Sequence, residues 1–475
     1  MALDSSLAAS PKPIVNSWDV FDTLLARFID AGSIFATVEA RHGAGSFVER
    51  RLAAQAELDK IGKPYVIYAI YDVMVQQGLS REMARRFLHD EITIERENLI
   101  PIRRNVMGVR PTDLIVSDMY LPPELISSLL FDVCEMQAHL PIVGSNWGKH
   151  TGTIWPELLK HYVIRRHVGD NPKSDRDVPS KFGIACELVD DSAPTGWEKT
   201  LHELGLDHLA RLQREARLRS IPPGATALHE LICGPYLSLL AGYAIHLVRK
   251  FGQDARFGFL SRDSDDLSRI FRTMFPSVAA FNIDLSRRLT RNATLDAFFT
   301  SRIDQATVLV DVLSTGRSFF NFAARTGANF RTFTTLLFLE RLLNADEKRV
   351  ADERRQSGKL DYFAVAGSDV PHYPLECLLQ SHYPPVSHVV HDTHSGGVIK
   401  TFGGQELSQD EQDIILWKSD VVAEFCRAIP RRGIALPTQA QLIPLIEKSL
   451  NAIISSAEVP RRFPSFLARE KFNPF

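Results

Sequence analysis

The chain has 475 residues, more than one hydrophobic core usually supports, so its length predicts two or three domains. Hydrophobic residues make up 45% and charged residues 24%, which is ordinary for a soluble globular protein. The formal net charge is −2 with basic and acidic residues interleaved, so no field of positive charge attracts nucleic acid or an anionic membrane. We therefore expect neither of these as a partner.

The five cysteines lie far apart and form no Cys-x-x-Cys pair, which disfavours a disulfide framework and a thiolate zinc site. The N-terminal residues lack the charged and then apolar pattern of a signal peptide. The sequence also contains no run of about 18 apolar residues. Together these features predict a cytoplasmic protein.

The first half of the chain alternates between strand-like and helical patterns. After a leader over residues 1–12, the apolar run "PIVNSWDVF" predicts a buried strand that leads into a loop. From about residue 32 to residue 99, long helical patterns predict an all-helical insertion. Strand-like segments then alternate with helix-length stretches, which is the rhythm of a parallel α/β sheet. These strand-like segments lie at 112–118, 140–146, 167–171 and 187–192.

The second half repeats this rhythm after a predicted linker. A basic helical segment over 209–227 ends in Pro222-Pro223-Gly224, which predicts a domain boundary there. The chain is thus divided into a first domain, a linker and a second α/β domain with a helical C-terminal extension. The predicted ranges are 12–208, 209–227, 228–400 and 401–475, and the strand-like segments of the second domain lie at 255–263, 280–288, 306–316 and 330–339.

Polar side chains follow each of the first four predicted strands. Ligands collect at the carboxyl ends of parallel strands, so these groups should share one crevice. Carboxylate oxygens suit Mg²⁺, Lys and Ser suit phosphoryl oxygens, and an Asp can attack phosphorus. A helix-capping role explains any one Asp equally well, but it explains the ordered set poorly. The set comprises Asp19 and Asp22, then Ser117 and Asp118, then Lys149, and finally Asp170 and Asp175.

This ordered set makes the first half resemble the haloacid dehalogenase superfamily of hydrolases, which are mostly phosphatases. The matching stretches are "WDVFDTLL", "IVSDMYLP", "GSNWGKHTGTIW" and "HVGDNPKSD", and the helical insertion, about 28–108, sits where that superfamily carries its cap domain. The resemblance implies a Rossmannoid parallel sheet and Mg²⁺ as cofactor. It further implies Asp19 as nucleophile and Mg²⁺ ligand, Ser117 as a phosphate hydrogen-bond partner, Lys149 as the neutralising charge, Asp170 as a Mg²⁺ ligand, and Asp175 as a partner of the metal or of Lys149.

One residue departs from the pattern of that superfamily. Its usual first motif is Asp-x-Asp-x-Thr, in which the second Asp protonates the leaving group; the register through Asp19 and Thr23 puts Phe21 at this position. The backbone carbonyl of Phe21 can still bind the metal, but a phenyl ring cannot donate the proton, a contribution worth about 10²–10⁴ in rate. Carbon–halogen cleavage is disfavoured because the chain keeps a metal carboxylate. Three explanations of the missing acid stay open. Asp22 or a group of the cap could supply the proton, or the leaving group could depart without one. Alternatively, the domain binds phosphate and turns over slowly or not at all.

The stretch "ATVLVDVLSTGRS" carries a second candidate site. Small hydroxyl residues around a glycine let successive N–H groups bind a phosphate, although an ordinary turn explains the stretch equally well. It resembles the phosphoribosyl-pyrophosphate loop of type I phosphoribosyltransferases, with Val310 in place of the first of two acids. The resemblance implies ribose contacts from Asp311, phosphate contacts from Ser314, Thr315, Gly316 and Ser318, and pyrophosphate contacts from the turn that holds Arg262 and Asp263.

These features predict a Mg²⁺-dependent hydrolase that acts through an aspartyl-phosphate at Asp19. The expected substrate is a phosphorylated small molecule, such as a nucleotide or sugar phosphate, and the second domain is expected to bind a ribose phosphate such as phosphoribosyl pyrophosphate. Two alternatives stay open: a sensor of phosphorylated ligands with little or no turnover, and an enzyme that works only through phosphoribosyl transfer in its C-terminal domain.

Overall fold

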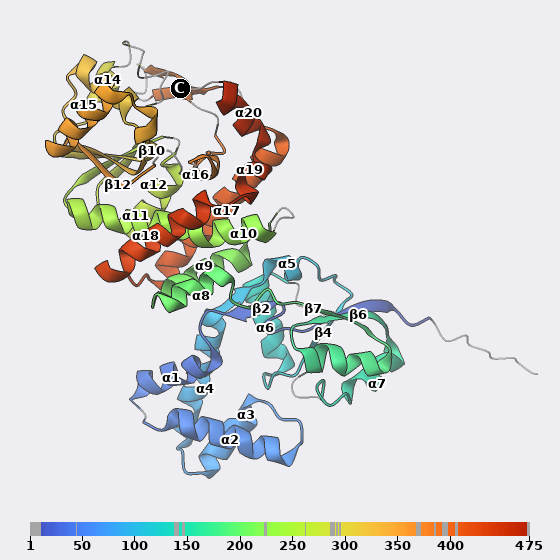
Figure 1. The fold of residues 1–475 in the computed structure, drawn as a ribbon. Helices are drawn as coiled ribbons and strands as arrows, with labels where there is room; N and C mark the ends of the chain where they lie inside the picture. The colour runs from blue at the N-terminus through green and yellow to red at the C-terminus, as the bar shows by residue number, and fades with distance from the viewer. Residues whose placement is uncertain are drawn as a thin grey trace, which may run out of the picture. The chain divides into compact units, whose positions relative to one another are not determined.

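The protein is described from a computed structural model, which divides into two compact units, Met1–Ala193 and Pro194–Phe475. Figure 1 shows the α/β character of each unit. The structure describes residues 11–43, 45–136, 142–144, 148–222, 226–261, 263–285, 290, 293, 296–366, 372–383, 386–391, 398–403 and 407–472.

The first unit is built on a five-stranded parallel sheet with the order β5-β4-β1-β6-β7. The chain starts in the middle of the sheet, adds strands on one side of β1 and then crosses to the other. The crossover leaves a crevice at the carboxyl ends of β1 and β6, where doubly wound sheets bind ligands. The strands are β1 (Ile14–Trp18), β4 (Leu114–Ser117), β5 (Ile142–Gly144), β6 (Val163–Gly169) and β7 (Ala185–Leu188).

Among the described residues, four helices lie between the short strands β2 (Leu25–Arg27) and β3 (Leu99–Pro101), within the range predicted for the helical insertion. The two strands pair antiparallel with each other. The helices are α1 (Ala31–His42), α2 (Phe47–Ile61), α3 (Ile67–Gln76) and α4 (Arg81–Asn98), drawn in blue in Figure 1. The Ser80 side chain caps α4 by accepting a hydrogen bond from the Met83 N–H, as this residue type does at helix N-termini.

Further helices of the first unit lie outside this insertion between β2 and β3. They are α5 (Arg103–Val106), α6 (Pro123–Cys134), α7 (Ile154–His161), a π-helical turn over Pro172–Asp177 and a 3₁₀ turn over Pro179–Phe182. Trp155 of α7 is fully buried against the sheet residues Val15, Leu114 and Ile164. These contacts attach α7 to the sheet.

The second unit has its own five-stranded parallel sheet, with the order β12-β11-β10-β8-β9. The predicted α/β class with parallel sheets is therefore confirmed. The strands are β8 (Arg256–Leu260), β9 (Ala280–Ile283), β10 (Thr307–Ser314), β11 (Thr332–Phe338) and β12 (Leu360–Val365). The helices around this sheet are α10 (Thr226–Leu231), α11 (Leu237–Phe251), α12 (Asp265–Met274), α13 (Asp296–Thr300), α14 (Arg317–Thr326), α15 (Ala345–Gln356) and α16 (Tyr373–Leu378).

The second unit begins before the segment predicted as a linker. Its first helices are α8 (Gly196–Glu203) and α9 (Asp207–Arg219), and α9 buries Leu209, Leu212 and Ala216. The buried Glu215 of α9 pairs with Arg431 and Arg432 of helix α17 (Gln409–Arg432) at 2.5 and 2.9 Å. The basic face suggested a solvated connector, but its apolar face packs into the unit. An antiparallel pair, β13 (Val386–His391) and β14 (Val398–Phe402), precedes the helical C-terminal segment, which continues with α18 (Gln439–Ile454), α19 (Glu458–Arg462) and α20 (Pro464–Phe472).

One continuous helical run in the described part of the chain, Ala227–Phe251, is long and apolar enough to cross a membrane by length and composition. In this structure 89% of its most apolar window is buried inside the protein. That degree of burial is typical of the core helix of a soluble protein.

Candidate active site

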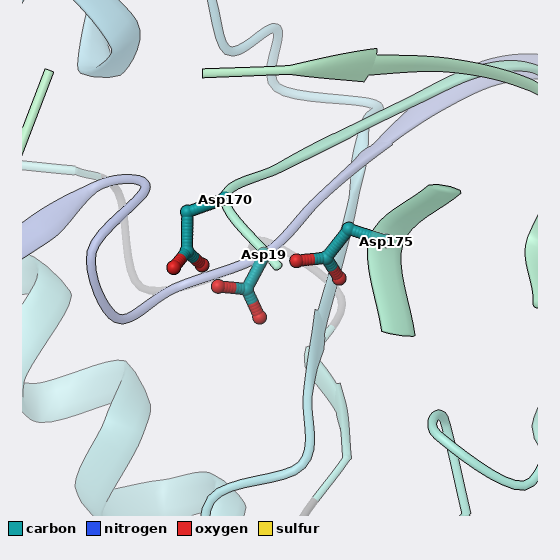
Figure 2. Close-up of side chains that lie close together, drawn as sticks. All are labelled: Asp19, Asp170 and Asp175. Atoms are coloured by element: carbon teal, nitrogen blue, oxygen red, sulfur yellow. The ribbon is translucent and has the colours of Figure 1, made fainter. Parts of the chain in front are cut away.

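Three aspartates converge at the carboxyl ends of β1 and β6. Asp19 follows β1, Asp170 follows β6, and Asp175 lies in the turn Pro172–Asp177. One carboxylate oxygen from each lies within 4.8 Å of the others. Figure 2 shows the three side chains approaching one another from separate segments of the chain. The sequence prediction that these residues share one crevice is supported by this geometry.

The local backbone explains how these carboxylates are held. The Asp19 N–H donates to the carbonyl of Val168 at 2.9 Å, so the pairing of β1 with β6 continues one residue past the end of β1. A Cβ atom at Gly169 would lie 2.3 Å from Cγ of Asp175, and only glycine leaves room for this carboxylate. The Asn171 N–H also donates to Oδ2 of Asp175 at 2.8 Å. Each residue of the "GDN" stretch thus has a physical role.

Lys149 brings a buried positive charge to the carboxylates. Its Nζ lies 2.5 Å from Oδ1 of Asp19 and 2.5 Å from Oδ1 of Asp175, and its side chain is only 2% exposed. The backbone N–H groups of Lys149 and His150 donate to the two carboxylate oxygens of Asp118, at 2.9 and 2.8 Å. Asp118, which follows β4, therefore positions the loop that carries the lysine. Sequence reasoning placed Asp118 in the crevice without this role.

His167 is a site residue that sequence reasoning missed. It is fully buried on β6, with Nε2 3.1 Å from Oδ1 of Asp175 and Nδ1 2.8 Å from Oγ of Ser17. Burial lowers the pKa of His167 to about 4, so the imidazole is neutral near pH 7. An ionised carboxylate only accepts, so Nε2 donates to Asp175 and Nδ1 accepts from the Ser17 hydroxyl. Ser17 lies opposite His167 on the neighbouring strand. This pairing depends on the register of the two strands, which the sequence does not reveal.

The charges in this crevice do not balance. Three carboxylates face one ammonium and a neutral imidazole, which leaves two excess negative charges when all three acids are ionised. Burial raises the pKa of Asp19 to about 7, and burial together with Asp175 and Asp22 raises the pKa of Asp170 to about 6. A divalent cation would remove this imbalance, and carboxylate oxygens are the donors that Mg²⁺ prefers.

The pKa values of Asp175 and Lys149 are shifted in the directions that keep both groups charged near pH 7. Burial disfavours the charged form of Asp175, but the His167 hydrogen bond and the Lys149 charge outweigh it and hold the pKa below its ordinary value. Burial likewise opposes the charge of Lys149, but Asp19 and Asp175 outweigh it and raise the pKa of the ammonium. Lys149 and Asp175 therefore form a stable ion pair near pH 7.

Two hydroxyl groups complete the crevice. The buried Thr23 donates from Oγ1 to Oδ2 of Asp19 at 3.1 Å, so both oxygens of this carboxylate have a partner. Ser117 is buried at the carboxyl end of β4, next to β1, and its Oγ accepts from the Met119 N–H at 3.2 Å. Ser117 thus lies at the sheet edge where the sequence predicted it.

Phe21 and Asp22 lie in a tight turn between β1 and β2. The carbonyl of Val20 accepts from the N–H groups of Leu24 and Leu25, and Asp22 adopts a left-handed backbone with φ of +59°. The guanidinium of Arg27 lies over the Phe21 ring, 4.6 Å from its centroid. A cation-covered aromatic ring therefore occupies the position where the superfamily pattern expects a carboxylic acid.

The segment predicted as strand-like over 306–316 forms β10, and Asp311 lies inside this strand, opposite Thr335 of β11. The strand continues past Asp311 because Val312 is fully buried and Leu313 nearly so. The Asp311 side chain accepts a hydrogen bond from the Val312 N–H at 2.9 Å. The ribose contact that the resemblance implies for Asp311 stays a prediction.

The loop after β10 is a turn stabilised by its own hydroxyl groups. Oγ of Ser314 accepts from the Gly316 N–H at 2.9 Å, and Oγ1 of Thr315 accepts from the Arg317 N–H at 3.3 Å. Gly316 has φ of +70° and precedes α14, which includes Ser318 in its first turn. Asp263 lies between β8 and α12, whereas Arg262 is outside the described residues. The Gly316 N–H, which was expected to bind phosphate, thus donates within the turn itself.

Comparisons of the sequence with protein-family models and with curated proteins found no match. The functional conclusion is therefore drawn from the geometry of the site.

Proposed function

We propose that the first unit is a Mg²⁺-dependent phosphomonoester hydrolase that acts through an aspartyl-phosphate at Asp19, as the resemblance to the haloacid dehalogenase superfamily implies. One observation carries the proposal: the buried Asp19 carboxylate contacts Lys149 and lies within 4.8 Å of two further carboxylates at the switch point of a doubly wound sheet. This arrangement supports a nucleophile, a neutralising cation and metal ligands at one point. The substrate is a phosphorylated small molecule.

The donor set fits Mg²⁺ because oxygen ligands and excess negative charge gather there. We assign Asp19, Asp170 and the Phe21 carbonyl as the groups that would hold the ion. Asp175 is already engaged by Lys149, His167 and the Asn171 N–H, so we assign it to positioning Lys149 beside the metal ligands. When bound, Mg²⁺ withdraws negative charge from the phosphoryl oxygens and lowers the repulsion that an attacking carboxylate meets.

The protein's own residues account for the rest of the chemistry. Thr23 and Lys149 fix the orientation of the Asp19 carboxylate, so its attack on phosphorus requires little reorganisation. The Lys149 ammonium neutralises charge on the transferred phosphoryl group, and the Ser117 hydroxyl can donate to one phosphoryl oxygen. Water then attacks phosphorus, which releases inorganic phosphate and restores Asp19. Burial keeps bulk water from competing for the nucleophile.

The test is Mg²⁺-dependent release of phosphate from 4-nitrophenyl phosphate and a panel of phosphorylated metabolites. Because an amide cannot form the acyl phosphate, Asp19→Asn should lower the rate by at least about 10³-fold. Asp177→Asn is the matched control, since this exposed carboxylate lies in the same turn as Asp175 and pairs with Arg176. Activity that survives in Asp19→Asn would contradict the assigned nucleophile. Mg²⁺-dependent phosphate binding without turnover would favour the sensor alternative.

A further inference from the structure

A cavity lies next to the candidate active site within the first unit. It lies between cap helix α4, which contributes Glu91 and Glu95, and the loop after β4, which contributes Met119, Tyr120 and Leu121. The cavity is small and partly open to solvent. The same loop begins directly after Ser117 and Asp118, and the Tyr120 carbonyl accepts from the Ile67 N–H of α3 at 2.7 Å. The cavity thus joins the cap to a catalytic loop.

The two carboxyl groups of this cavity differ in their partners. Arg51 donates to both oxygens of Glu91 at 2.9 Å, and the Tyr71 hydroxyl donates to one of them at 2.6 Å. This buried network belongs to the core of the cap. Glu95 accepts at Oε1 from Arg27 Nε at 2.8 Å and is 7% exposed. Of these two acids, Glu95 is therefore the one available for chemistry.

Glu95 is connected to the position that lacks the usual acid. The guanidinium of Arg27 binds Glu95 while it covers the Phe21 ring at 4.6 Å. The cavity that Glu95 lines is also lined by Met119, whose N–H donates to Oγ of Ser117 at 3.2 Å. Glu95 is thus connected with the crevice through Arg27 and through the loop after β4.

The environment of Glu95 favours a proton on its carboxyl group. The charged groups around it are Arg27 on β2, Glu91 one turn earlier on α4, and Asp22 in the turn after β1. Burial raises the pKa of Glu95, and the nearby Glu91 and Asp22 act in the same direction, against the opposing charge of Arg27. A protonated carboxyl group can donate to an oxygen atom, which the Phe21 ring cannot.

We propose that Glu95 donates the proton to the leaving-group oxygen, in place of the side chain at position 21, and that Arg27 is its positioning residue. This inference rests on the proposed function. The substrate class is a phosphomonoester of an alcohol, which needs a proton to leave.

The step balances as follows. An oxygen of Asp19 forms a bond to phosphorus while the bond from phosphorus to the ester oxygen breaks. The ester oxygen takes the Glu95 proton and leaves as the alcohol, so Glu95 becomes a carboxylate. Water then attacks the phosphorus of the aspartyl-phosphate, and the Glu95 carboxylate accepts one proton from that water. Inorganic phosphate leaves, and both carboxyl groups return to their starting states.

The test compares leaving groups in Glu95→Gln, which keeps the shape of the side chain. We expect kcat to fall about 10²-fold on phenyl phosphate and on an alkyl phosphate, but only about threefold on 4-nitrophenyl phosphate, because 4-nitrophenolate leaves without a proton. The retained rate on the nitrophenyl ester also shows that the variant is folded. Glu82→Gln is the matched control on α4, since Glu82 is 74% exposed and pairs only with Arg86 among the described contacts.

Each outcome has a separate meaning. An equal loss on all three substrates, or no loss, would overturn the role of Glu95 while leaving the proposed hydrolase intact. The same leaving-group dependence in Asp22→Asn and not in Glu95→Gln would transfer the role to Asp22 and overturn the inference. A wild-type protein that releases no phosphate from any of these esters would overturn the proposed function and this inference with it.

Discussion

Both units carry acidic residues at the carboxyl edge of a parallel sheet, but the acids have different surroundings. In the first unit, three carboxylates lie close together, and the one lysine that contacts two of them leaves excess negative charge when all three are ionised. In the second unit, Asp266 accepts from the Tyr236 hydroxyl and pairs with the buried Lys418, each at 2.7 Å. An acid neutralised by internal partners stabilises the fold, whereas acids with unbalanced charge would be stabilised by a bound cation.

The largest expected effects come from substitution of Lys149 in the first unit and of Lys418 in the second, which should differ in kind. Lys149→Met removes the charge beside Asp19 and should lower phosphate release by about 10³-fold. Lys418→Met removes the partner of Asp266 and should lower the free energy of unfolding by about 3–5 kcal/mol, because a buried charge loses its counter-ion. Its phosphate release should be unchanged at temperatures where it stays folded. Loss of activity in Lys418→Met at such a temperature would break the comparison.

His167 offers a smaller effect on activity. Without its hydrogen bond to Asp175, the Lys149–Asp175 pair loses its orientation, so His167→Leu should lower kcat by about 10- to 100-fold. His167→Gln can restore a donor to Asp175 and should recover part of this loss. Steady-state kinetics at saturating Mg²⁺ distinguish this from weaker metal binding. An unchanged kcat in His167→Leu would show that the buried imidazole only fills space.

The raised pKa of Asp170 predicts how the stability of the metal-free protein depends on pH. The pKa of Asp170 is raised to about 6, so between pH 4 and pH 6 the folded protein holds a proton that the unfolded chain has lost, and stability falls as pH rises through this window. The rise corresponds to about 3 kcal/mol, which solvent screening of this half-buried group reduces to about 1 kcal/mol. Without metal at pH 7.5, Asp170→Asn should therefore be more stable by that amount.

Mg²⁺ should reverse this order, because the ion stabilises the wild type and loses a ligand in the variant. Urea unfolding with and without Mg²⁺ measures both quantities, and Asp177→Asn again serves as the control. A metal-free Asp170→Asn variant that is less stable than the metal-free wild type would contradict the excess negative charge in the crevice.

The smallest effect concerns the loop of the second unit. Ser314→Ala removes the acceptor for the Gly316 N–H and should cost about 0.5 kcal/mol of unfolding free energy, with phosphate release unchanged. Thermal unfolding with phosphoribosyl pyrophosphate tests the predicted ligand of this loop. A shift in Tm that is present in the wild type and lost in Ser314→Ala would show that the loop binds a ligand as well as stabilising its own turn.

The sequence predicted the parallel sheets in outline because strands such as β4 and β10 are largely apolar runs that end in polar residues. The bounds of β6 were predicted poorly, because this strand carries Arg165, Arg166 and His167. The runs around Val15, Val116 and Val168 are buried, and the residues that follow them reach one crevice. Ligand-forming residues at strand ends can be predicted because parallel strands share an edge. Asp19, Asp170 and Asp175 were predicted to lie near one another for this reason, and their carboxylate oxygens lie within 4.8 Å of one another.

Other features depended on tertiary contacts. The partnership of Ser17 with His167 depends on strand register, and the role of Asp118 depends on a loop from another part of the chain. The burial of α9 depends on the distant helix α17, so its basic residues were misread as a linker.

The most direct test of the central claim is to trap the intermediate. The protein is mixed with Mg²⁺ and a phosphorylated substrate, quenched in acid within milliseconds, and digested for mass spectrometry. The expected result is a phosphoryl group on the peptide that holds Asp19, dependent on Mg²⁺ and absent from Asp19→Asn. Phosphate release at the wild-type rate without any phosphorylated Asp19 would contradict the claim.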